Sequence, residues 1–263
     1  MHLSNYHSHC SFCDGRSMPE EFVKFALAKS FRAYGISSHG PLPFETFWNM
    51  SAYDMPEYLV EISRLKDKYQ GHLEIYTGME IDYLDTTYNP SIPYFQNLPL
   101  DYRIGSVHFL PIATELCEAN MVCIDGPFSE FKQAVDTYFE GDIRKMVKRY
   151  YESSIRMVEL GGIDIVGHLD KIYMNGQRCK DFSFTAPWYR NMVNEYLEVI
   201  AGKGLIVEIN TKNLLKKQQT FPRQEYLSRM RELQIPVMVN SDCHTPDLVN
   251  DGRQQAFDML KQA

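Results

Sequence analysis

Six of the eight histidines and three carboxylates recur along this chain in short motifs that suit metal ligands. The first motif, Tyr6-His7-Ser8-His9, has two histidines two residues apart, and on a β-strand this spacing places both imidazoles on one face. Zinc takes three or four protein ligands, so nine groups suit two or three divalent ions that share a bridging carboxylate. Imidazole and carboxylate accept zinc, manganese and iron alike. The nine candidate ligands are His7, His9, Asp14, His39, Glu80, His108, His168, Asp242 and His244.

Each of these histidines has a simpler explanation when it is taken alone, namely a buried residue with a backbone partner. In isolation this explanation is favoured for His39, His108 and His168. However, six imidazoles and three acids that converge without metal would leave many buried polar groups unsatisfied, whereas metal ions neutralise the acids and use the imidazole lone pairs. The complete set therefore predicts a metal cluster. The remaining two histidines, His2 and His72, are expected at the surface.

The candidate ligands fall at the C-terminal ends of predicted strands. Short β-like runs alternate with longer helical patterns along the whole chain, which is typical of a parallel sheet wound by helices. Polar residues at nearly every strand end favour a TIM-like α/β barrel over an open sheet with a single switch point. We expect strands at Ser4–His9, Ala33–Ser38, Leu73–Ile81, Tyr102–His108, Gly162–Gly167, Leu205–Glu208 and Val237–Ser241.

The helical patterns between these strands often end at a glycine, such as Gly161 or Gly204, which is a common helix stop. Two further segments, Pro111–Pro127 and Met174–Pro187, are interpreted as loops over the strand ends. No internal repeat or low-complexity tract divides the chain, so we expect a single domain over residues 1–263. The expected helices are Pro19–Ser30, Pro56–Tyr69, Ser129–Leu160, Trp188–Lys203 and Arg223–Leu233.

The overall charge argues against a nucleic-acid partner. The formal net charge is −7, whereas binding to polynucleotides needs a basic patch. No uncharged apolar run is long enough for a signal peptide or a membrane span, so we expect no membrane contact and a cytoplasmic location. The six cysteines lack the density of a disulfide framework and are expected to be reduced. The oligomeric state is not indicated by the sequence.

A metal cluster gives an acidic chain a way to bind an anion. Three divalent ions held by three carboxylates leave a local charge of about +3, which suits a phosphate dianion. Phosphate ester hydrolysis is then the expected chemistry. For phosphate contacts beyond the metals, the candidates are Arg16, Lys171 and Lys212, each in a loop just past a predicted strand end. The alternative for each of them is a solvated surface charge.

The ordered set of nine ligands resembles the PHP (polymerase and histidinol phosphatase) family of metallo-phosphoesterases over nearly the whole chain. The resemblance implies a distorted (βα)7 barrel that forms one PHP metallo-phosphoesterase domain. It also implies a first ion held by His7, His9, Glu80 and Asp242, a second that Glu80 shares with His108 and His168, and a third at Asp14, His39 and His244. The catalytic residues expected among these ligands are Glu80, Asp242 and His244.

Local phrases resemble the monofunctional histidinol-phosphatases within that family. The resemblance implies a phosphomonoesterase that converts L-histidinol phosphate, a small-molecule ester, to L-histidinol and phosphate in histidine biosynthesis. The amine and imidazole of this substrate need acceptors and a flat wall, for which Asp82, Glu45 and the run Phe44–Trp48 are candidates. Related enzymes tend to carry an arginine at about the position of Met174, so either Lys171 substitutes for that arginine or the phosphate is bound differently. The phrases are His39-Gly40-Pro41-Leu42-Pro43-Phe44, Gly78–Tyr83, Ser106–Leu110, Gly167–Asp170 and Glu208–Thr211.

Other interpretations stay open beside this one. The same site can serve another phosphate ester, such as a phosphotyrosyl peptide or a small nucleotide. A metal-binding regulatory or structural protein is disfavoured because all nine ligand positions are filled. Amidohydrolases often begin with His-x-His too, but a bridging Glu80 and the late Asp242-x-His244 depart from their layout. Cys10 and Cys13 have CxxC spacing without a second pair, and no function is assigned to them.

Overall fold

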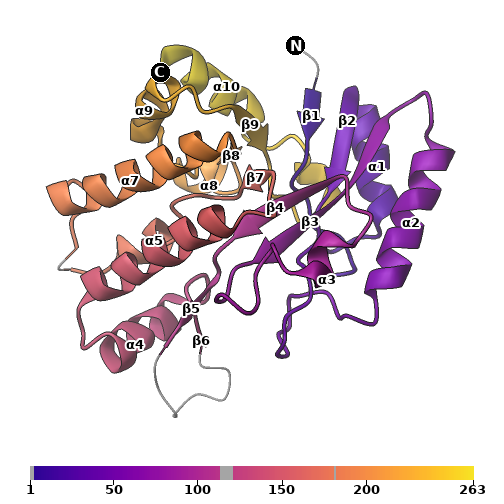
Figure 1. The fold of residues 1–263 in the computed structure, drawn as a ribbon. Helices are drawn as coiled ribbons and strands as arrows, with labels where there is room; N and C mark the ends of the chain where they lie inside the picture. The colour runs from indigo at the N-terminus through magenta and orange to yellow at the C-terminus, as the bar shows by residue number, and fades with distance from the viewer. Residues whose placement is uncertain (1–2, 113–120, 181) are drawn as a thin grey trace.

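A computed structural model describes residues 3–112, 121–180 and 182–263 of the chain, and its centre is a curved parallel sheet (Figure 1). The seven strands follow one another around the sheet in chain order, interrupted only by a separate hairpin of β5 (Phe109–Pro111) and β6 (Met121–Cys123). Every strand pair in the large sheet is parallel. The sheet consists of β1 (Leu3–Asn5), β2 (Phe31–Ile36), β3 (Glu74–Asp82), β4 (Tyr102–Ser106), β7 (Ile165–Val166), β8 (Ile206–Asn210) and β9 (Val237–Asn240).

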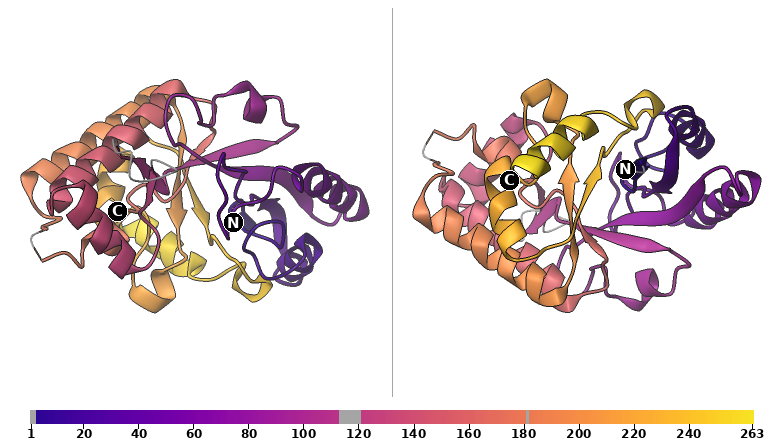
Figure 2. Two further views of the ribbon diagram at one scale, coloured as in Figure 1. Left: turned by 90° about the horizontal axis from the view of Figure 1, so that it is seen from below. Right: turned by 90° about the horizontal axis from the view of Figure 1, so that it is seen from above.

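Helices cover the outer face of this sheet, which is the arrangement of a nearly closed seven-stranded (βα) barrel (Figure 2). In α5, apolar residues at spacings of three and four, including Met146, Tyr150 and Met157, are buried against the sheet side. Among the described residues, no helix is both long and apolar enough to cross a membrane. The helices are α1 (Pro19–Ala28), α2 (Met55–Lys68), α3 (Pro93–Gln96), α4 (Phe128–Tyr138), α5 (Ile143–Leu160), α6 (Tyr173–Gly176), α7 (Pro187–Lys203), α8 (Leu214–Lys217), α9 (Leu227–Glu232) and α10 (Arg253–Gln262).

The structure confirms the predicted barrel and corrects several element boundaries. The single helix expected over Ser129–Leu160 is two helices, because Glu140 and Gly141 both adopt positive φ angles, which end α4. The loop expected over Met174–Pro187 begins within the short helix α6. The segment Pro111–Pro127 contains β6, and its residues 113–120 lie outside the described part of the chain. Helix α10 was not predicted.

The first strand is shorter than the sequence indicates. β1 ends at Asn5, so His7 and His9 lie beyond the ladder rather than on it. An isolated parallel bridge between Ser8 and Cys243 nevertheless keeps this segment extended, and the His9 amide donates to the Cys243 carbonyl at 2.9 Å. The two ends of the sheet therefore meet directly beside the histidine pair.

Below that bridge, side chains replace the missing backbone ladder between β1 and β9. The fully buried Asn5 carboxamide accepts from the Ser241 amide at 2.9 Å. Arg253 of α10 reaches into the same seam and donates to the carbonyls of Val239 and Ser4, one on each side. The Arg253 side chain is almost completely buried. Its guanidinium, rather than solvent, therefore provides the donors for these two carbonyls. The barrel is thus closed by one arginine at the end opposite the histidines.

We expect Arg253→Met to destabilise the fold by about 2–4 kcal/mol, because it leaves two buried carbonyls without donors. Urea unfolding followed by circular dichroism measures this. The matched control is Arg229→Met on α9, whose guanidinium forms surface ion pairs with Glu198 and Glu232 and should contribute under about 1 kcal/mol. Equal stability of the two variants would contradict the role given to Arg253.

Candidate metal centre

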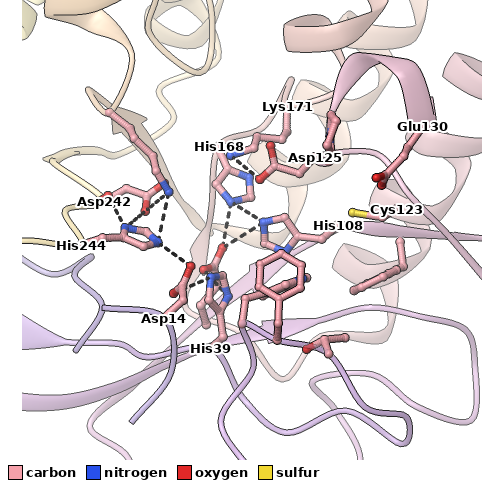
Figure 3. A pocket seen from close by; sticks show the side chains of 18 of the residues that line it. Asp14, His39, His108, Cys123, Asp125, Glu130, His168, Lys171, Asp242 and His244 are labelled. Atoms are coloured by element: carbon pink, nitrogen blue, oxygen red, sulfur yellow. Dashed lines mark hydrogen bonds and ion pairs between the residues drawn. The ribbon is translucent and has the colours of Figure 1, made fainter. Parts of the chain in front are cut away.

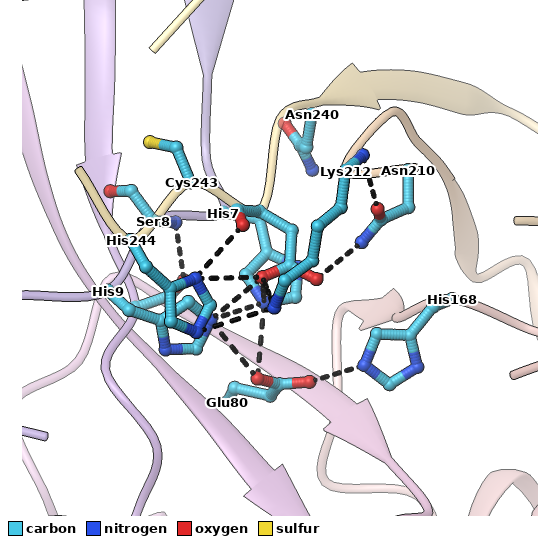
Figure 4. Close-up of polar contacts among 12 residues, drawn as sticks. His7, Ser8, His9, Glu80, His168, Asn210, Lys212, Asn240, Cys243 and His244 are labelled. Atoms are coloured by element: carbon cyan, nitrogen blue, oxygen red, sulfur yellow. Dashed lines mark hydrogen bonds and ion pairs between the residues drawn. The ribbon is translucent and has the colours of Figure 1, made fainter. Parts of the chain in front are cut away.

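All nine predicted ligands lie at the C-terminal end of the barrel. His39 lies just after β2, His108 just after β4 and His168 just after β7. Glu80 lies within β3. The remaining ligands lie in the loops after β1 and β9. His9 Nε2 is 3.3 Å from Asp242 Oδ1, and His244 Nε2 is 3.3 Å from Asp14 Oδ2 (Figure 4 shows His9, His244 and Glu80 together). Residues from both termini and from every part of the chain between them thus converge on one centre.

Glu80 is the central carboxylate of this cluster. Its side chain is 1 % exposed, and its two oxygens face different imidazoles. Oε2 lies 3.2 Å from His7 Nε2 and 3.0 Å from His39 Nδ1, whereas Oε1 lies 2.8 Å from His168 Nε2. A carboxylate whose oxygens face opposite sets of ligands has the geometry needed to bridge two cations.

Three sets of ligand atoms in the described chain lie close enough to share an ion. Within each set the ligand atoms are within 4.8 Å of one another. His9 and His39 each belong to two sets, so the groups overlap more than the expected division into three ions. His168 belongs to none of the sets, but its Nε2 is 3.1 Å from that of His108. The sets are His9, Asp14, His39 and His244; His7, His9 and Asp242; and His39, Glu80 and His108.

The atoms of the cluster need a cation to satisfy them. The Nε2 atoms of His7 and His9 are 3.0 Å apart, so at most one of them can hold a proton in that contact. Among the described residues, the buried Asp14 Oδ1 has no hydrogen-bond partner, and His39 Nδ1 forms no hydrogen bond although it lies 3.0 Å from Glu80 Oε2. A buried polar atom without a partner costs about 1–3 kcal/mol, and a divalent ion removes that cost. The residues present therefore fit divalent metal ions.

The pKa values of two candidate ligands, His9 and Glu80, favour the forms that bind metals, whereas the carboxylates around His7 outweigh the effect of burial and raise its pKa, so His7 must lose a proton to bind a metal. Burial lowers the pKa of His9 well below its usual value, and the neighbouring His39 and His244 add to this, so the imidazole is neutral at neutral pH. Burial alone would raise the pKa of Glu80, but the imidazoles of His7 and His39 hold it well below its usual range. Neutral imidazole and ionised carboxylate are the forms that ligate metals.

A second layer of carboxylates orients the ligands. Glu208 is fully buried; its Oε1 is 2.6 Å from His7 Nδ1, and its Oε2 accepts from the His168 amide at 3.0 Å. A proton on His7 Nδ1 leaves the Nε2 lone pair directed at the cluster. Glu208 belongs to one of the family phrases but was not predicted to have a role, because its partners lie just after β1 and β7 and cannot be inferred from chain spacing.

Asp82 orients His108 in the same way. The role expected for it from the sequence, as an acceptor for the substrate amine, is wrong. Its Oδ1 accepts from the His108 amide at 2.9 Å and lies 3.0 Å from His108 Nδ1. Burial lowers the pKa of His108, but Asp82 and Glu80 more than offset this and raise it to about 9. Asp82 does not line the cavity beside the cluster, so it is not positioned to accept a substrate amine.

A cavity of about 500 Å³ opens beside the cluster (Figure 3). Two of the three predicted phosphate contacts, Lys171 and Lys212, line it. Lys212 Nζ is 3.1 Å from Asp242 Oδ1 and 3.3 Å from His244 Nε2, next to the ligands themselves. Arg16 is exposed and is not among the lining residues, so the structure does not support its contact with a molecule in this cavity.

One wall of the cavity is aromatic, as the run Phe44–Trp48 suggested. Trp48 stacks on Phe109 with a ring-centroid distance of 5.5 Å and an interplanar angle of 4°. Phe47 lines the mouth and is 96 % exposed, whereas Phe44 packs edge-on against Phe109 and does not line the cavity. Trp48 also makes T-shaped contacts with His39 and His108, so it packs against two candidate ligands and lines the cavity.

Two acidic cavity residues, Asp125 and Glu130, were missed by the sequence analysis. Asp125 follows β6 and pairs with Lys171, while Glu130 begins α4 at the rim (Figure 3). Neither residue stands at the end of a barrel strand. The only signal in the sequence was their position near a segment expected to cover the strand ends.

The fold and the cluster define a barrel protein with a divalent metal centre. The model of the PHP domain matches residues 5–212, and the chain belongs to this family. Curated relatives include the histidinol-phosphatases of Bacillus subtilis, 28% identical over 90% of this chain and 92% of that one, and of Lactococcus lactis, 25% identical over 79% and 70%.

Solved structures share the fold along the whole chain. A Listeria monocytogenes protein superposes with a TM-score of 0.84 at 24% identity, covering 96% of this chain and 99% of that one. The histidinol phosphate phosphatase of Lactococcus lactis, solved with zinc, L-histidinol and phosphate, superposes with a TM-score of 0.72 at 21% identity, covering 98% and 92%.

We expect Glu208→Gln to lower the affinity for divalent metal by about 10–100-fold, because an amide cannot accept from both His7 and the His168 amide. Competition with a fluorescent chelator measures this affinity. Glu198→Gln, an exposed carboxylate on α7, is the control and should match the wild type. Unchanged affinity in Glu208→Gln would show that the second layer does not support the ligands.

Proposed function

We propose that this protein is a metal-dependent phosphomonoesterase that hydrolyses L-histidinol phosphate to L-histidinol and phosphate, a step of histidine biosynthesis. The observation that carries the proposal is the cluster of imidazoles and carboxylates around Glu80, which opens onto a cavity lined by two lysines. The names of the curated relatives support the substrate, as does the L-histidinol and phosphate held by the related Lactococcus lactis enzyme.

We assign two or three divalent ions, zinc, manganese or iron, to the nine ligands. When bound, such ions supply Lewis acidity and activate water for attack on phosphorus. The proposed catalytic residues are Glu80, Asp242 and His244, which act through the ions they hold. The first ion is assigned to His7, His9, Glu80 and Asp242, the second to Glu80, His108 and His168, and the third to Asp14, His39 and His244.

The chain's own side chains bind and orient the substrate. Lys212 lies against the ligands Asp242 and His244 and is proposed to donate to a phosphate oxygen that approaches the cluster. Trp48 and Phe109 both line the cavity and are proposed to form an apolar wall for the imidazole ring. The volume of the cavity suits a small-molecule phosphate ester.

The test compares kcat/KM for L-histidinol phosphate, an aryl phosphate, phosphotyrosine and a nucleoside monophosphate under one metal condition. We expect a preference of at least about tenfold for L-histidinol phosphate, because a site that pairs a substrate's polar groups rejects analogues that lack them. All activities should disappear with a chelator and return with Mn²⁺ or Zn²⁺. A preference of less than about tenfold would contradict L-histidinol phosphate as the substrate and would favour another phosphate ester.

A further inference from the structure

The cavity wall contains a largely buried ion pair whose two residues are not among the candidate metal ligands. Lys171 Nζ lies 3.0 Å from Asp125 Oδ2, and the lysine side chain is only 3 % exposed. Desolvating an ammonium and a carboxylate costs several kcal/mol per ion, so such a pair is weak evidence of a purely stabilising role. Both residues line the cavity beside His108 and His168 (Figure 3).

Asp125 has a free side that faces the cavity. Its carboxylate is 28 % exposed, and its contact with Lys171 is made through Oδ2 at 3.0 Å. In the described part of the chain, no other ion pair or side-chain hydrogen bond involves this carboxylate. Because a carboxylate has about four acceptor sites and Lys171 is its one charged partner among the described residues, Asp125 can still accept from a cationic group in the cavity.

The other acids of this region are less suited to that role. Asp82 and Glu208 are committed to His108 and His7. Glu45 and Glu130 line the cavity but are exposed at its rim, where water weakens a charge pair. Asp125 is thus the acid that combines partial burial, spare acceptor capacity and a position next to the cluster.

Lys171 has donors left for an anion. Besides Asp125, its ammonium lies over the Phe221 ring at 5.5 Å, a contact that needs no hydrogen bond. Burial disfavours its charge, but Asp125, followed by Asp242 and Glu80, raises its pKa well above the usual value. The ammonium therefore stays charged between the carboxylate of Asp125 and the cluster.

We propose that the Lys171–Asp125 pair selects phosphate monoesters that carry an ammonium on the carbon next to the ester carbon. Lys171 donates to a phosphate oxygen, and Asp125 accepts from the substrate ammonium. The positive and the negative group of the protein are therefore each paired with the opposite charge of the substrate. An ester without the amine places apolar surface against Asp125. The carboxylate then loses its water without gaining a hydrogen-bond donor in its place. This inference rests on the proposed function, because L-histidinol phosphate has this arrangement of charges.

The test uses two esters that differ only in the amine, 2-aminoethyl phosphate and ethyl phosphate. We expect the wild type to prefer the aminoethyl ester by at least about tenfold in kcat/KM, and Asp125→Asn to lose that preference. Glu130→Gln removes a nearby cavity acid with the same change of chemistry and should keep the wild-type ratio. The double variant Lys171→Met/Asp125→Asn avoids a buried unpaired lysine if the single variant folds poorly, and it should also lose the preference.

An unchanged ratio in a folded Asp125→Asn or double variant would overturn the role of Asp125, as would a wild type indifferent to the amine. An equal fall of the aminoethyl-to-ethyl preference in Glu130→Gln would also overturn that role. The preference would then depend on the total negative charge of the cavity and not on Asp125. The proposed substrate fails by a different result, a wild type that does not prefer L-histidinol phosphate over aryl phosphate. The two failures are therefore distinguishable.

Discussion

The structure depends on one electrostatic constraint: negative charge and imidazole lone pairs are concentrated among mostly buried side chains at one end of the barrel. Glu80 is at its centre, with Oε2 directed at His7 and His39 and Oε1 at His168. Such a concentration is unfavourable unless cations neutralise it. Divalent ions held by these residues would link strands that are distant in the chain, so the centre proposed for the chemistry would also contribute to the stability of the barrel.

The rest of the architecture keeps these groups in register. Because β1 and β9 contribute ligands from opposite ends of the chain, the seam between them must be fixed. The bridge from Ser8 to Cys243 fixes it beside the histidines, and Arg253 fixes it at the far end. Glu208 then links the seam to the middle of the sheet, since it contacts both His7 and His168. A carboxylate of β8 thus orients a candidate ligand in the loop after β1.

The sequence predicted the barrel and the gathering of the nine ligands because both follow from repeated local patterns. A polar residue at each strand end is visible in the chain, and parallel strands bring such ends to the same rim. The break at Glu140 and Gly141 was missed because the helical pattern runs on through it, and only the positive φ angles reveal it. The roles of Asp82 and Asp125 were missed because each depends on a partner placed by the fold, and a loop acid carries no periodic signal.

The most direct test of the central constraint is the metal content of the purified protein, measured by elemental analysis for the wild type, Glu80→Gln and Asp14→Asn. If Glu80 bridges two ions, the wild type should hold two or three equivalents of divalent metal per chain. Glu80→Gln should then lose more metal than Asp14→Asn, whose side chain is at the edge of the cluster and 30 % exposed. A fully active wild type without metal, or equal metal content in Glu80→Gln and the wild type, would contradict the account.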